Sequence, residues 1–144
     1  MPLRESGHME KTQTTLESSL ESVDQAEAIA VDEARKLGFD EDGQAQFGMA
    51  VREVMVNAVV HGNRYNQKKK VHLEIERSKD SLAFTLGDEG EGFDFNSLPD
   101  PLAPENLLRQ SGRGLMLARA FVDGFDLHPR AGGGTEVRLV KNLH

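Results

Sequence analysis

Three polar side chains recur at four-residue intervals in VREVMVNAVVHGN, namely Glu53, Asn57 and His61. At this spacing they would lie on one face of a helix, stacked turn over turn. The surrounding residues are almost all apolar, so the polar line is expected to face a cavity. A carboxylate offers a base, a carboxamide offers an oxygen ligand for Mg²⁺, and an imidazole offers a donor. The alternatives are the solvent edge of an amphipathic helix and, for His61, an ordinary helix C-terminal residue.

A second group of chemically useful residues is the loop DEGEGFD, residues 88–94. Asp88 could accept a hydrogen bond from an exocyclic amine, and Gly90 and Gly92 would let a flat ring lie close to the backbone. A base rather than a phosphate would account for carboxylates in a glycine-rich loop. The alternative is a turn after a strand, with solvated acids.

Gly112, Arg113 and Gly114 precede the helical pattern LMLARAFVD. Glycines at a helix start let backbone N–H groups approach a phosphate, and Arg113 could add positive charge. The segment is neither a Walker A motif nor a dinucleotide fingerprint, since neither pattern is complete. The alternative is a flexible loop that ends at a helix cap.

Local periodicity predicts the elements that position these groups. An edge strand is expected at 12–20, a helix capped by Ser22 and ended by Gly38, a second helix over 40–63, and a third from Gly114. Period-two alternation predicts hairpins at 71–86 and 126–140. Together they indicate an α+β fold, a two-layer α/β sandwich with a mixed sheet and helices on one face.

Composition narrows the functional classes. The 144 residues predict a single domain at 12–144 after a disordered N-terminus at 1–11. The net charge of −7 argues against nucleic-acid binding, and no apolar run is long enough to cross a membrane. The absence of cysteine excludes disulfides and thiolate zinc sites, and fits a cytoplasmic location.

Taken together, the motifs resemble the ATP-binding domain shared by gyrase, heat-shock chaperones, histidine kinases and mismatch-repair ATPases, which has the Bergerat-type fold. The order matches: E-x-x-x-N at Glu53/Asn57, D-x-G-x-G at 88–92, G-x-G at 112–114 and the late pair Gly134-Thr135. Within this superfamily, NAVVHGN and the stretch from DEGEGFD to SGRGLMLARAFVD are similar to the bacterial anti-sigma factor serine kinases. The resemblance covers about residues 12–142.

The resemblance implies a role for each of these residues. Asn57 would bind Mg²⁺, Glu53 would be the general base, and Asp88 would read the adenine amine with support from Thr135. The remaining nucleotide-binding residues would be His61, Gly90, Gly92, Gly112, Arg113, Gly114 and Leu115, with residues 95–111 as a mobile lid over ATP. Where these kinases often carry Thr before the metal-binding Asn, this chain has Val56, which removes one polar contact near the phosphates.

The resemblance also implies partners: a sigma factor and a STAS-type anti-anti-sigma protein that supplies the phosphate-accepting serine. The expected activity is that of a serine/threonine protein kinase and anti-sigma regulator. The alternatives are a nucleotide-binding module that sequesters a partner without kinase activity, and a histidine-kinase-like ATPase domain acting in trans. A homodimer is expected through the edge strand, because such a strand offers unpaired backbone groups.

Overall fold

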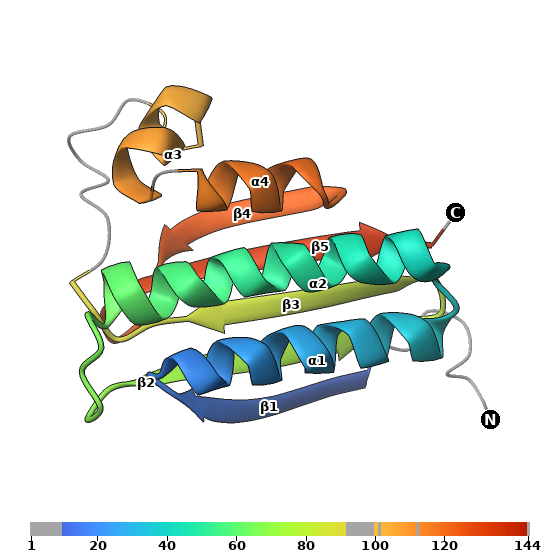
Figure 1. Cartoon of the computed structure of the whole chain (residues 1–144), viewed down its shortest axis with the longest axis horizontal. Helices are drawn as coiled ribbons and strands as arrows, with labels where there is room; N and C mark the ends of the chain where they lie inside the picture. Colours follow the sequence, from blue (N-terminus) through green and yellow to red (C-terminus); the bar gives the residue numbers. More distant parts are fainter. Residues whose placement is uncertain (1–9, 92–99, 101, 112, 144) are drawn as a thin grey trace.

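The computed structural model describes residues 10–91, 100, 102–111 and 113–143. In this part of the chain a five-stranded sheet carries a layer of helices on one face (Figure 1). The elements, in chain order, are β1 (Glu10–Glu17), α1 (Leu20–Leu37), α2 (Glu41–Val56), the π-helix η2 (Asn57–Gly62), β2 (Lys70–Arg77), β3 (Ser81–Gly87), α3 (Pro104–Ser111), α4 (Gly114–Ala120), β4 (Gly124–Pro129) and β5 (Thr135–Asn142).

The strand order is β1-β2-β3-β5-β4. All four strand pairs are antiparallel, so the two-layer α+β fold is confirmed while the expected mixed sheet is wrong. The two hairpins account for two of these pairs, β2–β3 and β4–β5, because short turns join antiparallel neighbours. On β2, Val71, Leu73 and Ile75 are buried towards the helices, and the residues between them are half-buried on the opposite face.

Helix α1 packs on the sheet through a line of small residues. Ala26, Ala30 and Ala34 are fully buried, and at this spacing they let α1 approach its neighbours closely. The N-cap is Ser19 rather than the expected Ser22, because the Ser19 hydroxyl accepts a hydrogen bond from the Ser22 N–H at 3.3 Å. Gly38 ends the helix in the left-handed region, φ 112°, as predicted.

Helix α2 forms the centre of the core and ends in a π-helix. Asp40 caps it by accepting from the Gly43 N–H at 2.8 Å, and the Phe47 ring packs edge-on against Phe84 of β3. From Asn57 the backbone widens into η2. A π-helix inside a helical run is often associated with functional sites.

The segment expected to be a loop and lid contains a helix. Helix α3 covers Pro104–Ser111 and buries Leu107 completely against the core, beside α4. Of the expected lid, residues 95–99 and 101 lie outside the described residues. The prolines mask the helix in the sequence, but Pro104 stands at the first helical position, where proline is tolerated.

At the N-terminal end, β1 starts at Glu10, two residues before the expected boundary, and pairs along its whole length with β2. Residues 1–9, part of the segment expected to be disordered, are outside the described chain. Within the described ranges no helix is long and apolar enough to cross a membrane.

Candidate functional site

Two of the three polar side chains spaced four residues apart, Glu53 and Asn57, lie where α2 passes into η2. Asn57 begins η2 and is 5% exposed, and its Oδ1 atom has no hydrogen-bond partner in the described structure. Glu53, half-buried one turn earlier, lies against the start of α4, since a Cβ on Gly114 would come within 3.0 Å of its Oε1. The structure therefore brings Glu53 against Gly114 of the second glycine segment.

Asp88 follows β3 and is only 3% exposed. Its Oδ1 accepts hydrogen bonds from the N–H groups of Gly90 at 2.9 Å and Thr135 at 3.2 Å. Burial raises the pKa of this carboxyl above its ordinary value, and the two backbone donors oppose the shift. The hydrogen bonds described for the Asp88 carboxylate both fall on Oδ1, which leaves Oδ2 to accept a donor from a ligand.

Three glycines from separate segments surround this carboxylate. A Cβ on Gly62 would lie 2.3 Å from Asp88 Oδ2, and one on Gly134 would lie 2.1 Å from the Asp88 carbonyl oxygen. A Cβ on Gly90 would lie 2.0 Å from the Gly62 carbonyl oxygen. Any side chain at these positions would displace Asp88 or its loop, so these glycines are required by the protein's own packing. The sequence predicted a glycine at position 90 to make room for a ligand ring. In the structure a glycine is required there already because the Gly62 carbonyl oxygen lies against it.

Asn63 is a further residue of this region that the sequence analysis treated only as a helix end. It is 2% exposed, donates through Nδ2 to the Lys70 carbonyl at 3.0 Å, and accepts at Oδ1 from the Glu89 N–H at 2.8 Å. Its partner Glu89 is 26 residues away in the sequence. Only the position of Asn63 directly after the glycine of NAVVHGN could have indicated this role.

The remaining predicted site residues divide into three groups. Thr135 is buried beside Asp88, and its N–H donates to Asp88 Oδ1. Leu115 is fully buried in the core, so its side chain packs against protein, and His61 and Arg113 are exposed. The wider turn of η2 also interrupts the expected straight stack, since Asn57 is buried and His61 is not. Gly92 and Gly112 lie outside the described residues.

Asn57 fits a Mg²⁺ ion. A carboxamide oxygen is a ligand type that Mg²⁺ accepts, and a metal would give the buried Oδ1 the partner that it lacks. No group of three or more histidine or acidic side chains among the described residues could hold a metal alone. Such an ion would take its other ligands from water and phosphate, which is the usual arrangement for Mg²⁺.

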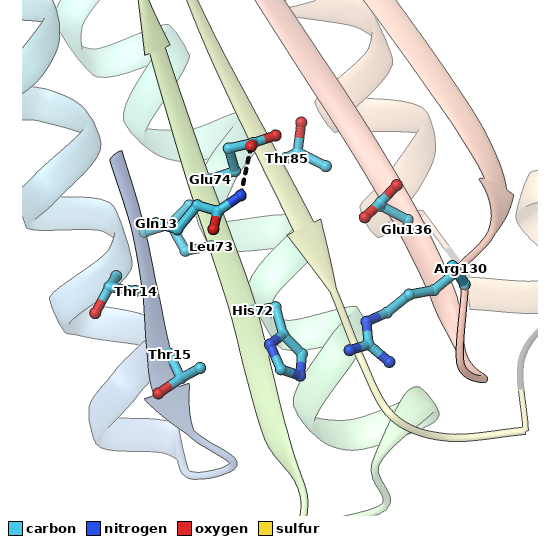
Figure 2. Close-up of a pocket in the computed structure, with 10 residues that line it drawn as sticks. Gln13, Thr14, Thr15, His72, Leu73, Glu74, Thr85, Arg130 and Glu136 are labelled. Atoms are coloured by element: carbon cyan, nitrogen blue, oxygen red, sulfur yellow. Dashed lines mark hydrogen bonds between the residues drawn. The ribbon is translucent and has the colours of Figure 1, made fainter. Parts of the chain in front are cut away.

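A hollow of about 610 Å³ lies elsewhere, on the sheet face opposite the helices (Figure 2). The side chains drawn there include Gln13 and Glu74, which hydrogen-bond to each other at 2.8 Å, and Arg130 and His72. None of the predicted nucleotide-site residues lines it. We therefore place the candidate site at the Asn57–Asp88 end of the molecule, where the ends of α2 and β3 meet the start of β5 (Figure 1).

Comparisons with known proteins identify the family and the fold of the chain. A family model described as a histidine kinase-like ATPase domain matches residues 16–141. The anti-sigma F factor of Bacillus subtilis is 30% identical over 106 residues, covering 71% of each chain. The serine-protein kinase RsbW of Oceanobacillus iheyensis is 27% identical over 105 residues, covering 69% of this chain and 66% of that protein.

A solved structure of the RsbU and RsbW domains of Rv1364c from Mycobacterium tuberculosis has the same fold. The TM-score is 0.65 at 20% identity, and the match covers 93% of this chain but only 32% of that one. The family match and the shared fold thus define an ATPase-type domain built on one sheet and one helical layer. The chain belongs to the histidine kinase-like ATPase domain family, and its predicted similarity to anti-sigma factors and serine-protein kinases within it is confirmed.

Proposed function

We propose that this protein is an ATP-dependent serine protein kinase that also binds a sigma factor. In this proposal the phosphate acceptor is a serine on a STAS-type anti-anti-sigma protein. Phosphorylation decides which of the two partners this protein binds, and the proposed location is the cytoplasm. The names of the relatives, anti-sigma F factor and serine-protein kinase RsbW, support the two halves of the proposal.

The observation that carries the proposal is the unpartnered Oδ1 of Asn57, one helical turn from the Glu53 carboxylate. Phosphoryl transfer requires a positioned metal and a base near the attacking hydroxyl more than it requires a covalent intermediate. A buried oxygen left without a donor suits a metal ligand. A half-buried carboxylate beside it suits the base.

The nucleotide would extend from Asp88 to the second glycine segment. Asp88 Oδ2 would accept the adenine amine, with Thr135 and Gly90 holding Oδ1 of the same carboxylate. Asn57 would hold Mg²⁺, which would neutralise charge on the phosphates in the transition state. Arg113 and the backbone at Gly112 and Gly114 would lie over the phosphates.

In the transfer step Glu53 acts as general base. It accepts the proton of the partner's serine hydroxyl while the serine oxygen bonds to the γ-phosphorus of ATP. The bond between that phosphorus and the β–γ bridging oxygen breaks, and ADP leaves with the electron pair. No nucleophile of this chain is used.

Transfer from γ-phosphate-labelled ATP tests the proposal. The purified protein and its Glu53→Gln variant are each incubated with Mg²⁺, labelled ATP and a lysate of the source organism. We expect label on a serine of one small protein with the wild type and none with Glu53→Gln, because the carboxamide cannot accept the proton. Calorimetry should give the same ATP affinity for both proteins, since in this proposal Glu53 contacts the reacting hydroxyl and not the adenine.

Two results would contradict the proposal. Full transfer by Glu53→Gln would remove the general-base assignment. ATP binding by the wild type without any labelled protein would favour the module that sequesters its partner, for which the apolar Val56 before Asn57 is the supporting observation.

A further inference from the structure

Glu89 stands between Asp88 and Gly90, yet its carboxylate turns away from the candidate site. Oε1 accepts a hydrogen bond from the Lys70 N–H at 3.1 Å, and Oε2 lies 2.6 Å from Nε2 of His72. The hydrogen bond with His72 lowers the pKa of Glu89, although partial burial opposes the shift. Figure 2 shows His72 on the open face of the sheet. The acid therefore fastens the Asp88 loop to β2.

Asn63 completes a closed ring with this acid. Its Oδ1 accepts from the Glu89 N–H, its Nδ2 donates to the Lys70 carbonyl, and the Lys70 N–H donates to Glu89 Oε1. Asn63 is itself tied to η2, because its own N–H donates to the Ala58 carbonyl at 2.8 Å. The ring thus joins the end of the π-helix, the start of β2 and the loop after Asp88.

The ring sets the position of the Asp88 carboxylate. Gly62, directly before Asn63, lies against Oδ2, and the N–H of Gly90, directly after Glu89, donates to Oδ1. If the ring opened, Gly62 and Gly90 could both shift, and only the hydrogen bonds with the Thr135 backbone would still hold Asp88 in place. A hydrogen bond to a ligand amine depends on distance and angle, so its strength depends on this support.

We propose that Asn63 and Glu89 are positioning residues for recognition of a purine base, acting through Asp88. They make the site prefer a base with an exocyclic amine over one with a carbonyl oxygen at the same place. The inference rests on the proposed function only in taking Asp88 as the base-reading group. It requires no phosphate transfer.

Calorimetric titration with Mg·ATP and Mg·ITP tests the inference, because the base of ITP carries a carbonyl oxygen where adenine carries the amine. The wild type should prefer ATP. Glu89→Ala should lower the ratio of ATP to ITP affinity about tenfold, roughly the net contribution of one hydrogen bond, by weakening ATP binding alone. Glu89→Gln should recover most of the preference, since a carboxamide oxygen can still accept the Lys70 N–H.

Glu74→Ala is the matched control. Glu74 lies on the same open face, two residues from His72, and bonds to Gln13 rather than to the loop. It should keep the wild-type ratio. Amide hydrogen exchange gives a second readout that needs no ligand: residues 89–90 should exchange faster in Glu89→Ala than in Glu74→Ala.

Equal weakening of ATP and ITP in Glu89→Ala, or unchanged exchange at 89–90, would overturn the inference. The absence of any ATP preference in the wild type would also overturn it. These outcomes are distinct from failure of the kinase proposal, which would show as an intact ATP preference with no labelled serine. Asn63→Ala is a poorer first test, because its loss from the interior also destabilises the fold.

Discussion

Two buried asparagines near the site make opposite contributions to folding. Asn63 has both ends of its carboxamide hydrogen-bonded, whereas Oδ1 of Asn57 has no partner in the described structure. Leaving a buried polar group unsatisfied costs about 1–3 kcal/mol. The unsatisfied Asn57 oxygen thus destabilises the folded protein, and a ligand that bound it would remove this cost. Asn63, in contrast, stabilises the fold through its hydrogen bonds.

This contrast gives a paired prediction. Asn57→Ala should change the free energy of unfolding by less than about 1 kcal/mol, because the unsatisfied group disappears together with its contacts. Asn63→Ala should destabilise by about 2–3 kcal/mol, because it orphans the Glu89 N–H and the Lys70 carbonyl. Urea unfolding measures both. A large loss in Asn57→Ala would mean that its carboxamide is a structural group.

Asn57→Ala should also lose the part of the nucleotide affinity that depends on Mg²⁺. Calorimetry with ATP in the presence of Mg²⁺ and in the presence of EDTA separates the two contributions. We expect Asn57→Ala to bind as weakly with Mg²⁺ as the wild type binds in EDTA. If the variant still responded to Mg²⁺ as the wild type does, Asn57 would not be the metal ligand.

At the scale of elements, the Gly132–Gly134 turn provides a matched pair of residues. Gly133 and Gly134 both have positive φ, 113° and 99°, so alanine strains the backbone at either position. A Cβ on Gly133 would have no atom within 4 Å, whereas a Cβ on Gly134 would lie 2.1 Å from the Asp88 carbonyl oxygen. The two positions therefore separate backbone strain from loss of space at the site.

Gly133→Ala should cost about 1 kcal/mol and keep ATP affinity, because only the backbone conformation is disfavoured. Gly134→Ala should cost about 1–3 kcal/mol more and lose most ATP affinity, because Asp88 must move. Chemical denaturation and calorimetry on both variants measure these effects. Equal ATP affinity in the two variants would show that the Gly134–Asp88 contact does not shape the site.

Periodicity predicted the elements well where one local signal decided them. The helix ended by Gly38 and the two hairpins are examples, because each depends on side-chain alternation or on a single glycine. The π-helix at Asn57 was missed, since NAVVHGN fits an α-helix equally well. Helix α3 was missed because Pro104 and the prolines just before it in the sequence are typical of a loop. The surroundings of Asp88 could not be predicted from the sequence, because Gly62, Gly90 and Gly134 come from separate segments that meet only in the folded protein.

For the whole molecule, the exposed outer edge of β1 leads to a prediction about assembly. Strand β1 is the last strand of the sheet on its side and pairs only with β2 within the described chain. An edge strand presents unpaired N–H and C=O groups with which a strand of another chain can pair. We expect a homodimer through β1, detected by light scattering as a mass that doubles with concentration. Amides at residues 10–17 should become more protected from hydrogen exchange over the same range. A monomer at all concentrations would contradict it.

The two layers are also joined by an ion pair. Arg77 at the end of β2 donates to Glu33 of α1 through Nε at 2.6 Å and through Nη2 at 2.7 Å. The Glu33 side chain is 11% exposed. The hydrogen bond from Arg77 lowers the pKa of Glu33 below its ordinary value of 4.5, with desolvation in opposition. This two-point contact is stronger than the usual surface ion pair.

The lowered pKa predicts how acid acts on the fold. In the unfolded chain Glu33 titrates at its ordinary value, so the stabilisation is complete above about pH 4.5 and is lost as the pH falls through the lower folded-state pKa. Glu33→Gln should therefore lose about 1–2 kcal/mol of stability at pH 7 and show a shallower decline below pH 4.5. Urea unfolding from pH 7 to pH 3 measures both effects.

Asp32→Asn is the control. The neighbouring Asp32 carboxylate pairs with Arg35 and Lys36 in solvent, where water screens the charges. The decline in stability of this variant below pH 4.5, its acid limb, should therefore follow that of the wild type. Identical acid limbs for Glu33→Gln and the wild type would show that the two layers are held together by apolar packing alone.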